Sequence, residues 1–472
     1  MATSSSISTS ASTSLGGVLD VPSLVSQLMA VERQPINKLN TTVASYQSQI
    51  SSLGTIQGLV SSFQGAEQSL STSLQGYGAA SSSTSITASA TSAAIAGVYS
   101  LTVGALAQSQ NLVATGQAST TATINAGTST TVTFDFGTTS GTIFTSNGSG
   151  TKSVTIDSTN NTLQGIRDAI NAANIGVTAT IVNDGSATPY RLVITSNNSG
   201  ASNSLKITTN GAGNGVDSLL AYDPAGTKNL TQTVAAQDAS YTVNGIAMTS
   251  SSNTIANAIQ GVSLTLSGTT ASPATLTVAH DTNAVSTAAA NFVSAYNALY
   301  TQLKSRSAYG SATTTAGSLA GDGTVRLMMS QLQSIFMTPA TPATGGSLTL
   351  LAQAGITTQT DGTLKLDSTV LNSAMTSNYS DVNNLFTSAS GFLTRLDTWA
   401  TSAITPGGLI ATHITDINTT ITGLNEQISQ LNNRMTQLQA YYTTQYTNLN
   451  MLLSSMNSTS SFLTQALSNT TK

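Results

Sequence analysis

The stretch ITDINTTITGLNEQISQLNNRMTQLQAYY, residues 414–442, carries the most regular apolar pattern in the chain. Apolar residues return at alternating spacings of three and four through about four heptads, which is the pattern of a coiled-coil helix. The regular positions are Ile414, Ile417, Ile421, Leu424, Ile428, Leu431, Met435, Leu438 and Tyr442. After Gln445 the pattern resumes more loosely with Leu449, Leu452 and Met456. The sequence therefore predicts a long amphipathic helix, with these twelve side chains as candidate partner contacts.

The residues that flank this stripe carry almost no charge, so opposite charges do not select a partner. The flanking residues are Asn418, Thr420, Asn425, Gln427, Asn432 and Arg434. The stripe can pair with an N-terminal helix of the same chain, with other copies of the chain, or with different helices at different times. For residues 414–442 an intramolecular pair and an intermolecular one are both open. From residue 443 onward we expect a helix that depends on a partner.

A second amphipathic segment, LDVPSLVSQLMAVERQP, occupies residues 19–35. Its candidate contact face is formed by Leu24, Leu28 and Val31, with Val25 and Met29 beside them. Asp20 or Ser23 can cap this helix, and Pro35 is expected to end or kink it. We do not expect a signal peptide, because Arg33 is the first basic residue and polar residues interrupt the apolar run. The apolar face must meet another surface.

Composition excludes several classes of protein. The 472 residues include only 14 Lys plus Arg and 18 Asp plus Glu, and no charged residue lies between Glu67 and Asp135. Nucleic-acid binding is not expected, because it draws on clustered Lys and Arg. There is no cysteine, so disulfides and thiolate metal sites are excluded. No apolar run approaches the ~18 residues of a membrane span, so membrane insertion is not expected.

The pattern of apolar residues along the chain changes twice. Helical spacing continues to about residue 76, strand-like runs broken by Gly, Asn and Ser follow to about residue 280, and helical spacing then returns around Asn283. Within the middle region, SVTID at 153–157 predicts a strand and Asn161 can cap a short helix. One face of that helix is apolar and consists of Leu163, Ile166 and Ile170. Strands at 177–182 and 190–195 then flank a turn, which gives a strand, a helix and a hairpin packed as one small sheet under a helix.

The predicted fold class is therefore α+β, in a discontinuous multidomain chain. Terminal helices form a coiled-coil or helical-bundle leg, and β-rich domains of small sheets with a short helix are inserted between them. The expected domains are a terminal leg, partly disordered, at 1–39 and 413–472; a helical bundle with a small hairpin at 40–76 and 284–412; a β-rich domain at 77–112 and 233–283; and an outer β-rich domain with the strand–helix–hairpin motif at 113–232.

Signatures of catalysis are nearly absent, and we expect neither an enzyme nor a cofactor. Only two histidines exist, His280 and His413, so a multi-histidine metal site is excluded. Phosphate-loop, nucleophile-elbow and zinc-protease motifs do not occur. Asp157, Asp168 and Asp184 lie near one another in sequence, but turn chemistry and solvent exposure explain them better than an ion site does. Core packing likewise explains Trp399, Met328 and Met329.

Several stretches together resemble the bacterial flagellar filament cap family, also called hook-associated protein 2. LDVPSLVSQLMAVERQPINKL at 19–39 is similar to the N-terminal signature of the family. TLQGIRDAINAANIGVTATIVNDGSATPYRLVITSNNSGASNSLKI resembles the repeat that flagellins and hook-associated proteins share. Further stretches match in the expected order: AQDASYTVNGIAMTSSSNTIANAIQGVSLTL, NFVSAYNALYTQL, GDGTVR and GITTQTDGTLKLDSTVLNSAM. The resemblance spans nearly the whole chain.

The resemblance implies a secreted protein that crosses the flagellar export channel unfolded, without a cleaved signal peptide, and acts outside the cell at the filament tip. It implies a homo-oligomeric ring, pentameric in the familiar case, with terminal helices as legs and β-rich domains as a plate. Such a cap retains exported flagellin so that it folds and polymerises, which filament elongation and motility require. Implied partners are other copies of the chain, flagellin, the hook–filament junction proteins, and an export chaperone at the C-terminal helix.

Two alternatives remain at this point. One is another hook-associated or filament structural protein, although the long β-rich insertion and the N-terminal signature count against it. The other is a surface adhesin for cell adhesion, whose neutral Thr- and Asn-rich domains bind host glycans. Neutral polar surfaces suit sugar hydroxyls, but the middle region offers no aromatic cluster on which a sugar would stack.

Overall fold

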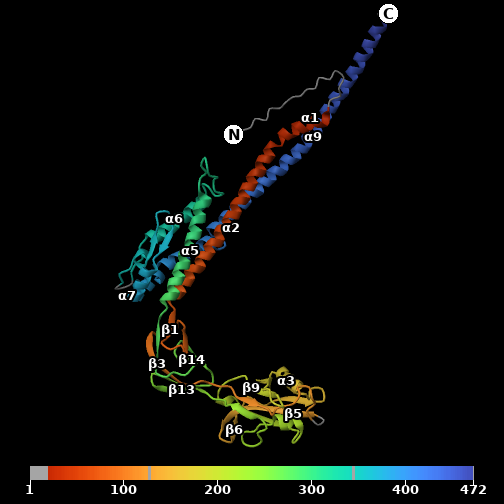
Figure 1. Ribbon diagram of the computed structural model, residues 1–472. Coiled ribbons are helices and arrows are strands. Elements are labelled where there is room, and N and C mark those ends of the chain that lie inside the picture. Colours follow the sequence, from red (N-terminus) through yellow and green to blue (C-terminus); the bar gives the residue numbers. More distant parts are fainter. Residues whose placement is uncertain (1–19, 126–128, 343–345, 471–472) are drawn as a thin grey trace. The chain divides into compact units, whose positions relative to one another are not determined.

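A computed structural model of the chain describes residues 20–125, 129–342 and 346–470 (Figure 1). The chain divides into two compact units, one formed by Met1–Ser71 with Ala284–Lys472 and the other by Thr72–Asn283. The first is mainly helical and the second is built from strands. The predicted α+β class with a discontinuous helical part is confirmed. The finer division into four domains stays a prediction, and the low-complexity stretch 1–14 lies outside the described residues.

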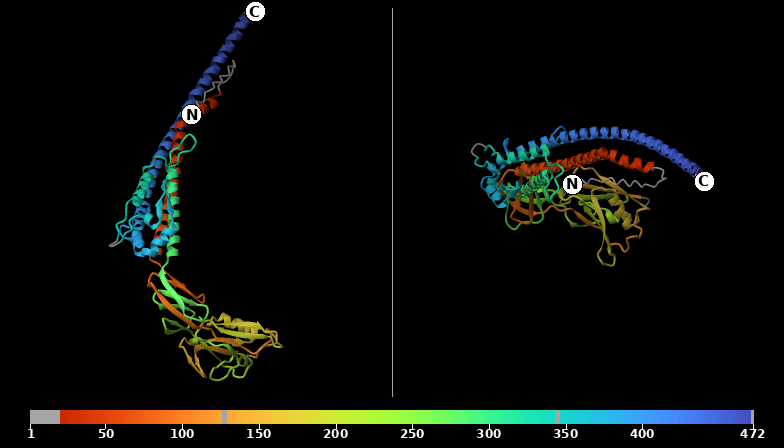
Figure 2. Two further views of the ribbon diagram at one scale, coloured as in Figure 1. Left: turned by 60° about the vertical axis from the view of Figure 1, so that its left-hand side comes forward. Right: turned by 90° about the horizontal axis from the view of Figure 1, so that it is seen from above.

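The helical unit is formed by long helices and one short hairpin (Figures 1 and 2). A one-turn 3-10 helix at Leu351–Ala354 leads into the hairpin, and Asn297 bonds both the backbone N–H and the carbonyl of Leu364 in its second strand. The elements are α1 (Val21–Glu32), α2 (Gln34–Leu74), α5 (Thr282–Ser307), α6 (Gly323–Met337), β17 (Ile356–Thr358), β18 (Leu364–Leu366), α7 (Ser368–Thr387), α8 (Phe392–Ile404) and α9 (Leu409–Thr470).

The core of the helical unit is organised around Phe63 of α2, whose side chain is fully buried. Its ring centroid lies 5.3 Å from that of Phe292 and 6.0 Å from that of Tyr296, both on α5. The ring of Trp399, on α8, lies 6.4 Å away on another side and donates its indole N–H to Gln331 Oε1 at 3.1 Å. One aromatic cluster therefore joins α2, α5 and α8, and Trp399 is a core residue, as the sequence indicates.

The boundary between α1 and α2 follows from a cap and a proline. Asp20 Oδ1 accepts the N–H of Ser23 at 3.1 Å, so Asp20 is the capping residue of α1. Helix α1 ends at Glu32 and α2 begins at Gln34, with Pro35 in the first turn of α2. Proline has no N–H for the preceding turn and disfavours helical backbone just before it. The predicted interruption therefore falls at Arg33.

One part of the β-rich unit packs two antiparallel sheets around a shared core. In the β12–β13 hairpin Val243 pairs with Ile246 across a two-residue turn, where Asn244 and Gly245 have φ of 50° and 82°. Asn and Gly tolerate this left-handed backbone best. The first sheet has the order β1 (Tyr77–Ser81), β16 (Ala274–His280), β3 (Gly97–Ala105), β12 (Ala239–Val243) and β13 (Ile246–Ser250); the second has the order β14 (Thr254–Ile259), β15 (Val262–Leu266) and β2 (Ile86–Ala90).

The other part of the β-rich unit holds two further sheets and two short helices around a second core. A single 3-10 turn, Ala201–Asn203, precedes β10. In one sheet β5 (Ser129–Ser140) pairs with β10 (Ser204–Thr209), β6 (Ile143–Ser146) and β7 (Lys152–Asp157), and the other has the order β11 (Thr231–Val234), β4 (Asn111–Val113), β9 (Tyr190–Ser196) and β8 (Val177–Asn183). The helices are α3 (Leu163–Ala172) and α4 (Gly215–Leu220).

The strand–helix–hairpin unit differs in two details from the sequence prediction. Thr162, and not Asn161, caps α3, because the Thr162 hydroxyl accepts the N–H of Gly165 at 3.0 Å. The strand β7 and the hairpin β8–β9 belong to different sheets, since β7 pairs with β5. The apolar face of α3 is fully buried against both sheets. The core around α3 therefore includes strands from outside the strand–helix–hairpin unit. That face consists of Leu163, Ile166 and Ile170, as predicted.

The aromatic cluster predicts the effect of a cavity in the helical unit. Phe63→Ala should lower the free energy of unfolding of this unit by about 3–5 kcal/mol, because a fully buried ring is replaced by a void. Urea unfolding followed by the fluorescence of Trp399 measures this directly. The matched control is Tyr309→Ala, whose ring is 73% exposed and whose loss should cost less than about 0.5 kcal/mol. Equal urea midpoints for the two variants would contradict the central role of Phe63.

Candidate functional site

Helix α1 packs on α9 through a small apolar cluster. Val21, Val25 and Met29 follow one another at a spacing of four, so they lie on one face of α1, and all three are buried. They meet Ile36 of α2 and Met435 of α9, which are buried as well. Partly buried residues of α9 surround the cluster: Ile428, Leu431, Leu438, Tyr442 and Tyr446. Helix α1 therefore pairs with the middle part of α9.

The predicted stripe on α9 is mostly shielded from solvent up to Tyr442. Ile417 and Met435 are buried, with 5% and 6% of their surface exposed. The other predicted positions in this part are half-buried: Ile414, Ile421, Leu424, Ile428, Leu431, Leu438 and Tyr442. The residues between them are exposed, apart from the half-buried Gly423, and this is the asymmetry that an amphipathic helix at a bundle surface shows.

On α1 the structure places a neighbouring face, and not the predicted one, against α9. Leu24 and Leu28 are only half-buried, and Val31 is 50% exposed. Val21, the first residue of the buried row, is missing from the predicted face because it lies between the cap Asp20 and a proline. A spacing of four from Val21 through Met29 is the signal that could have found this row. The predicted face of α1 stays partly open for another partner.

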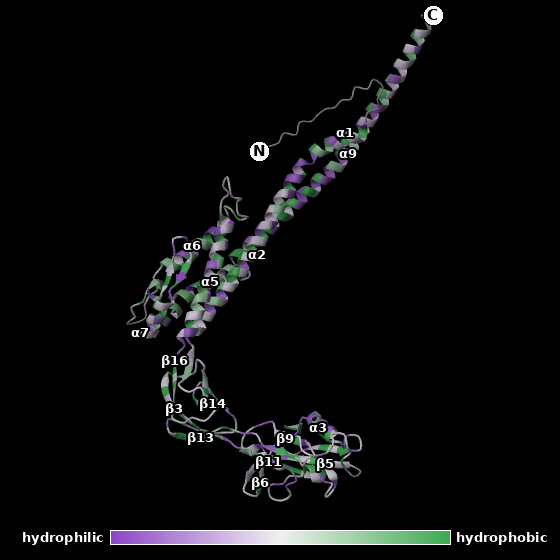
Figure 3. Cartoon of the chain, in the orientation of Figure 1, coloured by the Kyte–Doolittle hydropathy of each residue, from purple (hydrophilic) through white to green (hydrophobic). Residues whose placement is uncertain are grey.

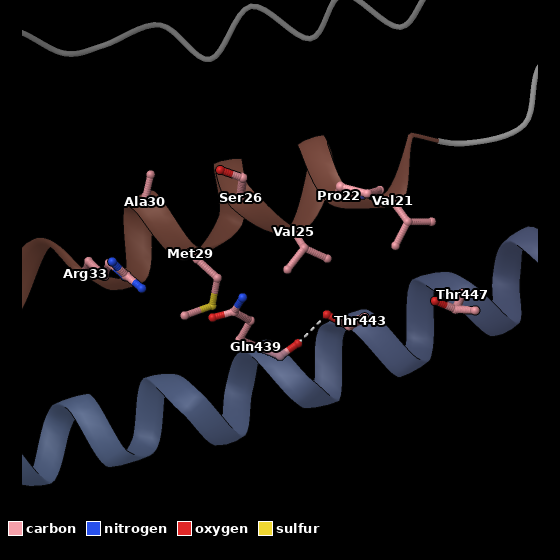
Figure 4. A pocket seen from close by; sticks show the side chains of 10 residues that line it. All are labelled: Val21, Pro22, Val25, Ser26, Met29, Ala30, Arg33, Gln439, Thr443 and Thr447. Atoms are coloured by element: carbon pink, nitrogen blue, oxygen red, sulfur yellow. Dashed lines mark hydrogen bonds between the residues drawn. The ribbon is translucent and has the colours of Figure 1, made fainter.

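A groove of about 570 Å³ runs between α1 and α9 (Figure 4). In the close-up, Val25 and Met29 point from α1 toward α9. The hydroxyl of Thr443 donates to the carbonyl oxygen of Gln439 at 2.7 Å within α9, so its one donor is already used and only its acceptor oxygen is open to the groove. The groove is lined by Val21, Pro22, Val25, Ser26, Met29, Ala30, Arg33, Gln439, Thr443 and Thr447. Its lining is uncharged except for Arg33.

Beyond the start of α1, none of the described helices covers α9 (Figures 1 and 3). Its large apolar side chains there are exposed, from 40% for Leu453 to 72% for Phe462. Apolar side chains gathered on one exposed helix usually mark an interaction surface. We call this surface the uncovered face of α9. It consists of Leu449, Leu452, Leu453, Met456, Leu463 and Leu467 on one side of the helix, with Met451 and Phe462 on the opposite side, and includes three predicted contact residues.

The heptad row keeps its phase past the start of α1. Tyr442 and Tyr446 both join the α1 cluster, and Tyr446 lies one residue after Gln445, where the alternation calls for an apolar residue. Leu449 and Met456 follow Tyr442 at seven and fourteen residues, so they continue the same row. The predicted stripe is thus divided by exposure, into a part that packs within the chain up to Tyr442 and an exposed part from Leu449.

The aspartates noted in the sequence have ordinary structural roles. Asp184 pairs with Arg191, which together with Ser186 holds the pKa of its carboxyl down at about 2. Hydrogen bonds from Thr159 lower the pKa of Asp157. Asp168 lies 2.7 Å from the guanidinium of Arg167. These contacts give each carboxylate a local partner.

The two histidines are separate as well. His413 Nε2 lies 2.7 Å from Asp322 Oδ2 in the helical unit, and His280 stacks on Tyr77 in the β-rich unit. Within the described residues, no three His, Cys, Asp or Glu side chains gather as a metal site would require. None of the helices in the same ranges combines the length and apolar character that crossing a bilayer needs.

Comparison with known proteins places these features in a family. The models described as "Flagellar hook-associated protein 2 N-terminus" and "Flagellar hook-associated protein 2 C-terminus" match residues 18–110 and 236–458. A flagellar hook-associated protein 2 of Escherichia coli O157:H7 is 33% identical, over 96% of this chain and 97% of its own length. The chain belongs to the flagellar hook-associated protein 2 family. The B-type flagellar hook-associated protein 2 of Pseudomonas aeruginosa is 30% identical over 93% of this chain and 94% of its own.

Solved structures of the hook-associated protein 2 family agree with the fold. The crystal structure of the D1-D2-D3 domains of the flagellar cap protein FliD from Escherichia coli covers 78% of this chain and 99% of its own, with a TM-score of 0.63 and 32% identity. The model described as "Flagellin hook IN motif" matches residues 131–198, which contain α3 and the β8–β9 hairpin. The strand–helix–hairpin unit thus lies within a recognised sequence motif.

The α1–α9 contact can be tested by breaking it from one side. Val25→Asp should release α1 from α9, because it places a charge in the apolar cluster, and a buried Val contributes about 1.5–3 kcal/mol. Amide hydrogen exchange in α1 should then accelerate by about tenfold or more. Val31→Asp is the matched control, since Val31 is exposed on the same helix. Equal acceleration in both variants would contradict the observed face.

Proposed function

We propose that this chain caps the distal end of the bacterial flagellar filament and promotes folding and polymerisation of exported flagellin there. Membership of the hook-associated protein 2 family supports this role, and a relative that matches 78% of the chain is described as a flagellar cap protein. The observation that carries the proposal is the uncovered face of α9. A helix that leaves a row of Leu, Met and Phe open to solvent needs a partner to bury it.

In this proposal the uncovered face of α9 and the open face of α1 form a leg that binds helices at the filament tip. Each Leu, Met or Phe of the face that becomes fully buried contributes about 1.5–3 kcal/mol. No charged residue lies between Arg434 and Lys472. Binding through such a surface rests on apolar packing and is little affected by salt. It also tolerates partners of different sequence, which suits a leg that meets flagellin, the hook–filament junction proteins and other copies in turn.

The finer features of the role are part of the same proposal. The chain assembles into a ring, for which we propose five copies, and acts outside the cell at the flagellar tip. It reaches that place unfolded through the flagellar channel, and the absence of cysteine keeps disulfides from trapping it on the way. An export chaperone covers the uncovered face of α9 before secretion, because an exposed apolar helix otherwise favours aggregation. No enzymatic step and no cofactor belongs to this role.

Adhesion to host glycans stays a separate hypothesis. A shallow groove of about 330 Å³ on β3, β12 and β13 is lined in part by the hydroxyls of Thr102, Ser240, Thr242 and Thr249, which suit sugar hydroxyls. Tyr241, the aromatic residue in its lining, is buried and offers no stacking face. The uncovered face of α9 favours assembly over adhesion as the main role.

Deleting residues 443–472 should leave a folded protein but abolish cap function, because it removes the uncovered face of α9 while sparing Met435. The measurement is filament length and motility in a capless bacterium that carries the truncated gene. The triple variant Leu449→Gln, Leu452→Gln, Met456→Gln should reproduce the loss. A matched control in the same segment is Thr444→Gln, Asn448→Gln, Ser455→Gln, which changes exposed polar residues only. Filaments of normal length after the truncation would refute the assigned leg.

The purified chain should associate with itself into a closed ring. Electron microscopy of the purified protein shows whether rings form, and analytical sedimentation gives the number of copies. Closed rings are expected because a cap must cover the circular end of a filament, and closed symmetry is the usual result when identical subunits associate. Monomers alone at micromolar concentrations and above would count against the proposal.

A further inference from the structure

Glu67 is a buried carboxyl that neither the helical pair nor the groove uses. The chain has only three glutamates, and the other two, Glu32 and Glu426, are half-buried and exposed. Glu67 lies on α2 one turn after Phe63, and only 3% of its surface is exposed. Its Oε2 atom is buried and has no hydrogen-bond partner. A buried oxygen without a partner is costly to hold when it carries charge.

The charged group that acts on Glu67 is another carboxylate, that of Asp397. Asp397 on α8 accepts the side-chain N–H of Gln64 at 2.8 Å and that of Gln68 at 3.3 Å through its Oδ1 atom. Gln64 also bonds the hydroxyl of Thr401 at 2.9 Å. Two amides of α2 that flank Glu67 thus direct hydrogen bonds to Asp397. The contact between α2 and α8 therefore brings two acids together and satisfies one of them.

Three cationic side chains of the surrounding helices make their hydrogen bonds to groups other than Glu67. Arg306 at the end of α5 donates to Ser52, on the far side of Phe63 from Glu67 along α2. Arg395 of α8 donates twice to the carbonyl of Thr338, and His413 of α9 pairs with Asp322. Burial, and then the charge of Asp397, raise the pKa of Glu67 to about 7. Among the described charged groups, Asp397 is the one that acts on Glu67, and it repels the ionised form.

We propose that Glu67 is a protonation switch for the helical unit. While its carboxyl holds a proton, α2 and α8 pack without opposing charges. When the proton leaves, the negative charges of Glu67 and Asp397 repel each other across this contact, and the buried Oε2 of Glu67 holds charge without a hydrogen bond, so the contact weakens. The switch goes beyond capping, because it makes the stability of the helical unit depend on the pH around the protein.

The direction of the pH dependence follows from proton binding. An ordinary glutamate has a pKa of 4.5, whereas that of Glu67 in the folded chain is about 7. Between these values the folded state binds more protons than the unfolded state, so stability falls as pH rises through this window and levels off above it. A carboxylate with a lowered pKa, such as Asp184, acts oppositely and favours the folded state above its pKa.

The test compares the full chain with Glu67→Gln, whose amide resembles the protonated carboxyl. Trp399 is the only tryptophan and lies on α8, so its fluorescence during urea unfolding reports the helical unit alone. As pH rises, the variant should become more stable to urea relative to the unaltered chain. The ratio of their unfolding constants should change about ten- to hundred-fold between about pH 5 and about pH 8. A ratio that is the same at both pH values would overturn the switch.

Two further variants test whether the pH dependence arises at the buried site and how much Asp397 contributes to it. Glu426→Gln makes the same chemical change at an exposed position of α9, and its ratio to the unaltered chain should not vary with pH. A variation as large as that of Glu67→Gln would overturn the assignment to the buried site. Asp397→Asn removes the smaller cause, so the transition should move to lower pH and yet stay above 4.5, because burial is the larger cause. A transition that does not move would remove Asp397 from the switch.

A spectroscopic measurement keeps the proposal testable if Glu67→Gln does not fold. Infrared difference spectra of the unaltered folded chain should show a protonated carboxyl that disappears as pH rises past about 7. Protonated carboxyls are otherwise lost well below neutral pH. Absence of this signal at about pH 6 would overturn the proposal.

Discussion

Helix α9 has more apolar surface than α1 can cover, and the proposed binding of partner helices depends on this difference. The covering helix has 12 residues and α9 has 62. Where the two overlap, Val25 and Met29 bury part of the stripe, and Tyr446 is the last residue of α9 that packs on their cluster. Beyond it no residue of the described chain takes over. The hydrophobic effect, with almost no contribution from charge, then makes the molecule incomplete on its own.

The sequence predicted most of what periodicity can show. The stripe from Ile414 to Tyr442, the interruption near Pro35 and the buried face of α3 follow from spacing alone, because spacing reports which face of an element is apolar. It does not report how a helix is rotated against its neighbour, so it did not single out Val21, Val25 and Met29 as the row that packs on α9. Nor does it report which strands pair at a distance, and β7 therefore belongs to another sheet than expected.

Glu67 was missed for a related reason. Apolar spacing treats a carboxyl as a surface residue, and nothing in the local sequence marks this one as buried. Its burial follows from its place one turn after Phe63, a residue that α5 and α8 enclose. Asp397 comes from a helix some three hundred residues away, as the hydrogen bond from Gln64 to Asp397 illustrates. Long-range pairs of this kind require the folded chain.

The interruption at Arg33 has a consequence for exchange. Because α1 and α2 are separate helices, α1 can leave α9 while α2 stays packed around Phe63, and the loss is limited to a few buried side chains. An incoming helix with a longer apolar face could start on the uncovered end of α9 and then displace α1 turn by turn, as an invading strand displaces a shorter one in a nucleic-acid duplex. Such an exchange would make α1 a replaceable partner of α9, and it would begin at the exposed C-terminal end of α9.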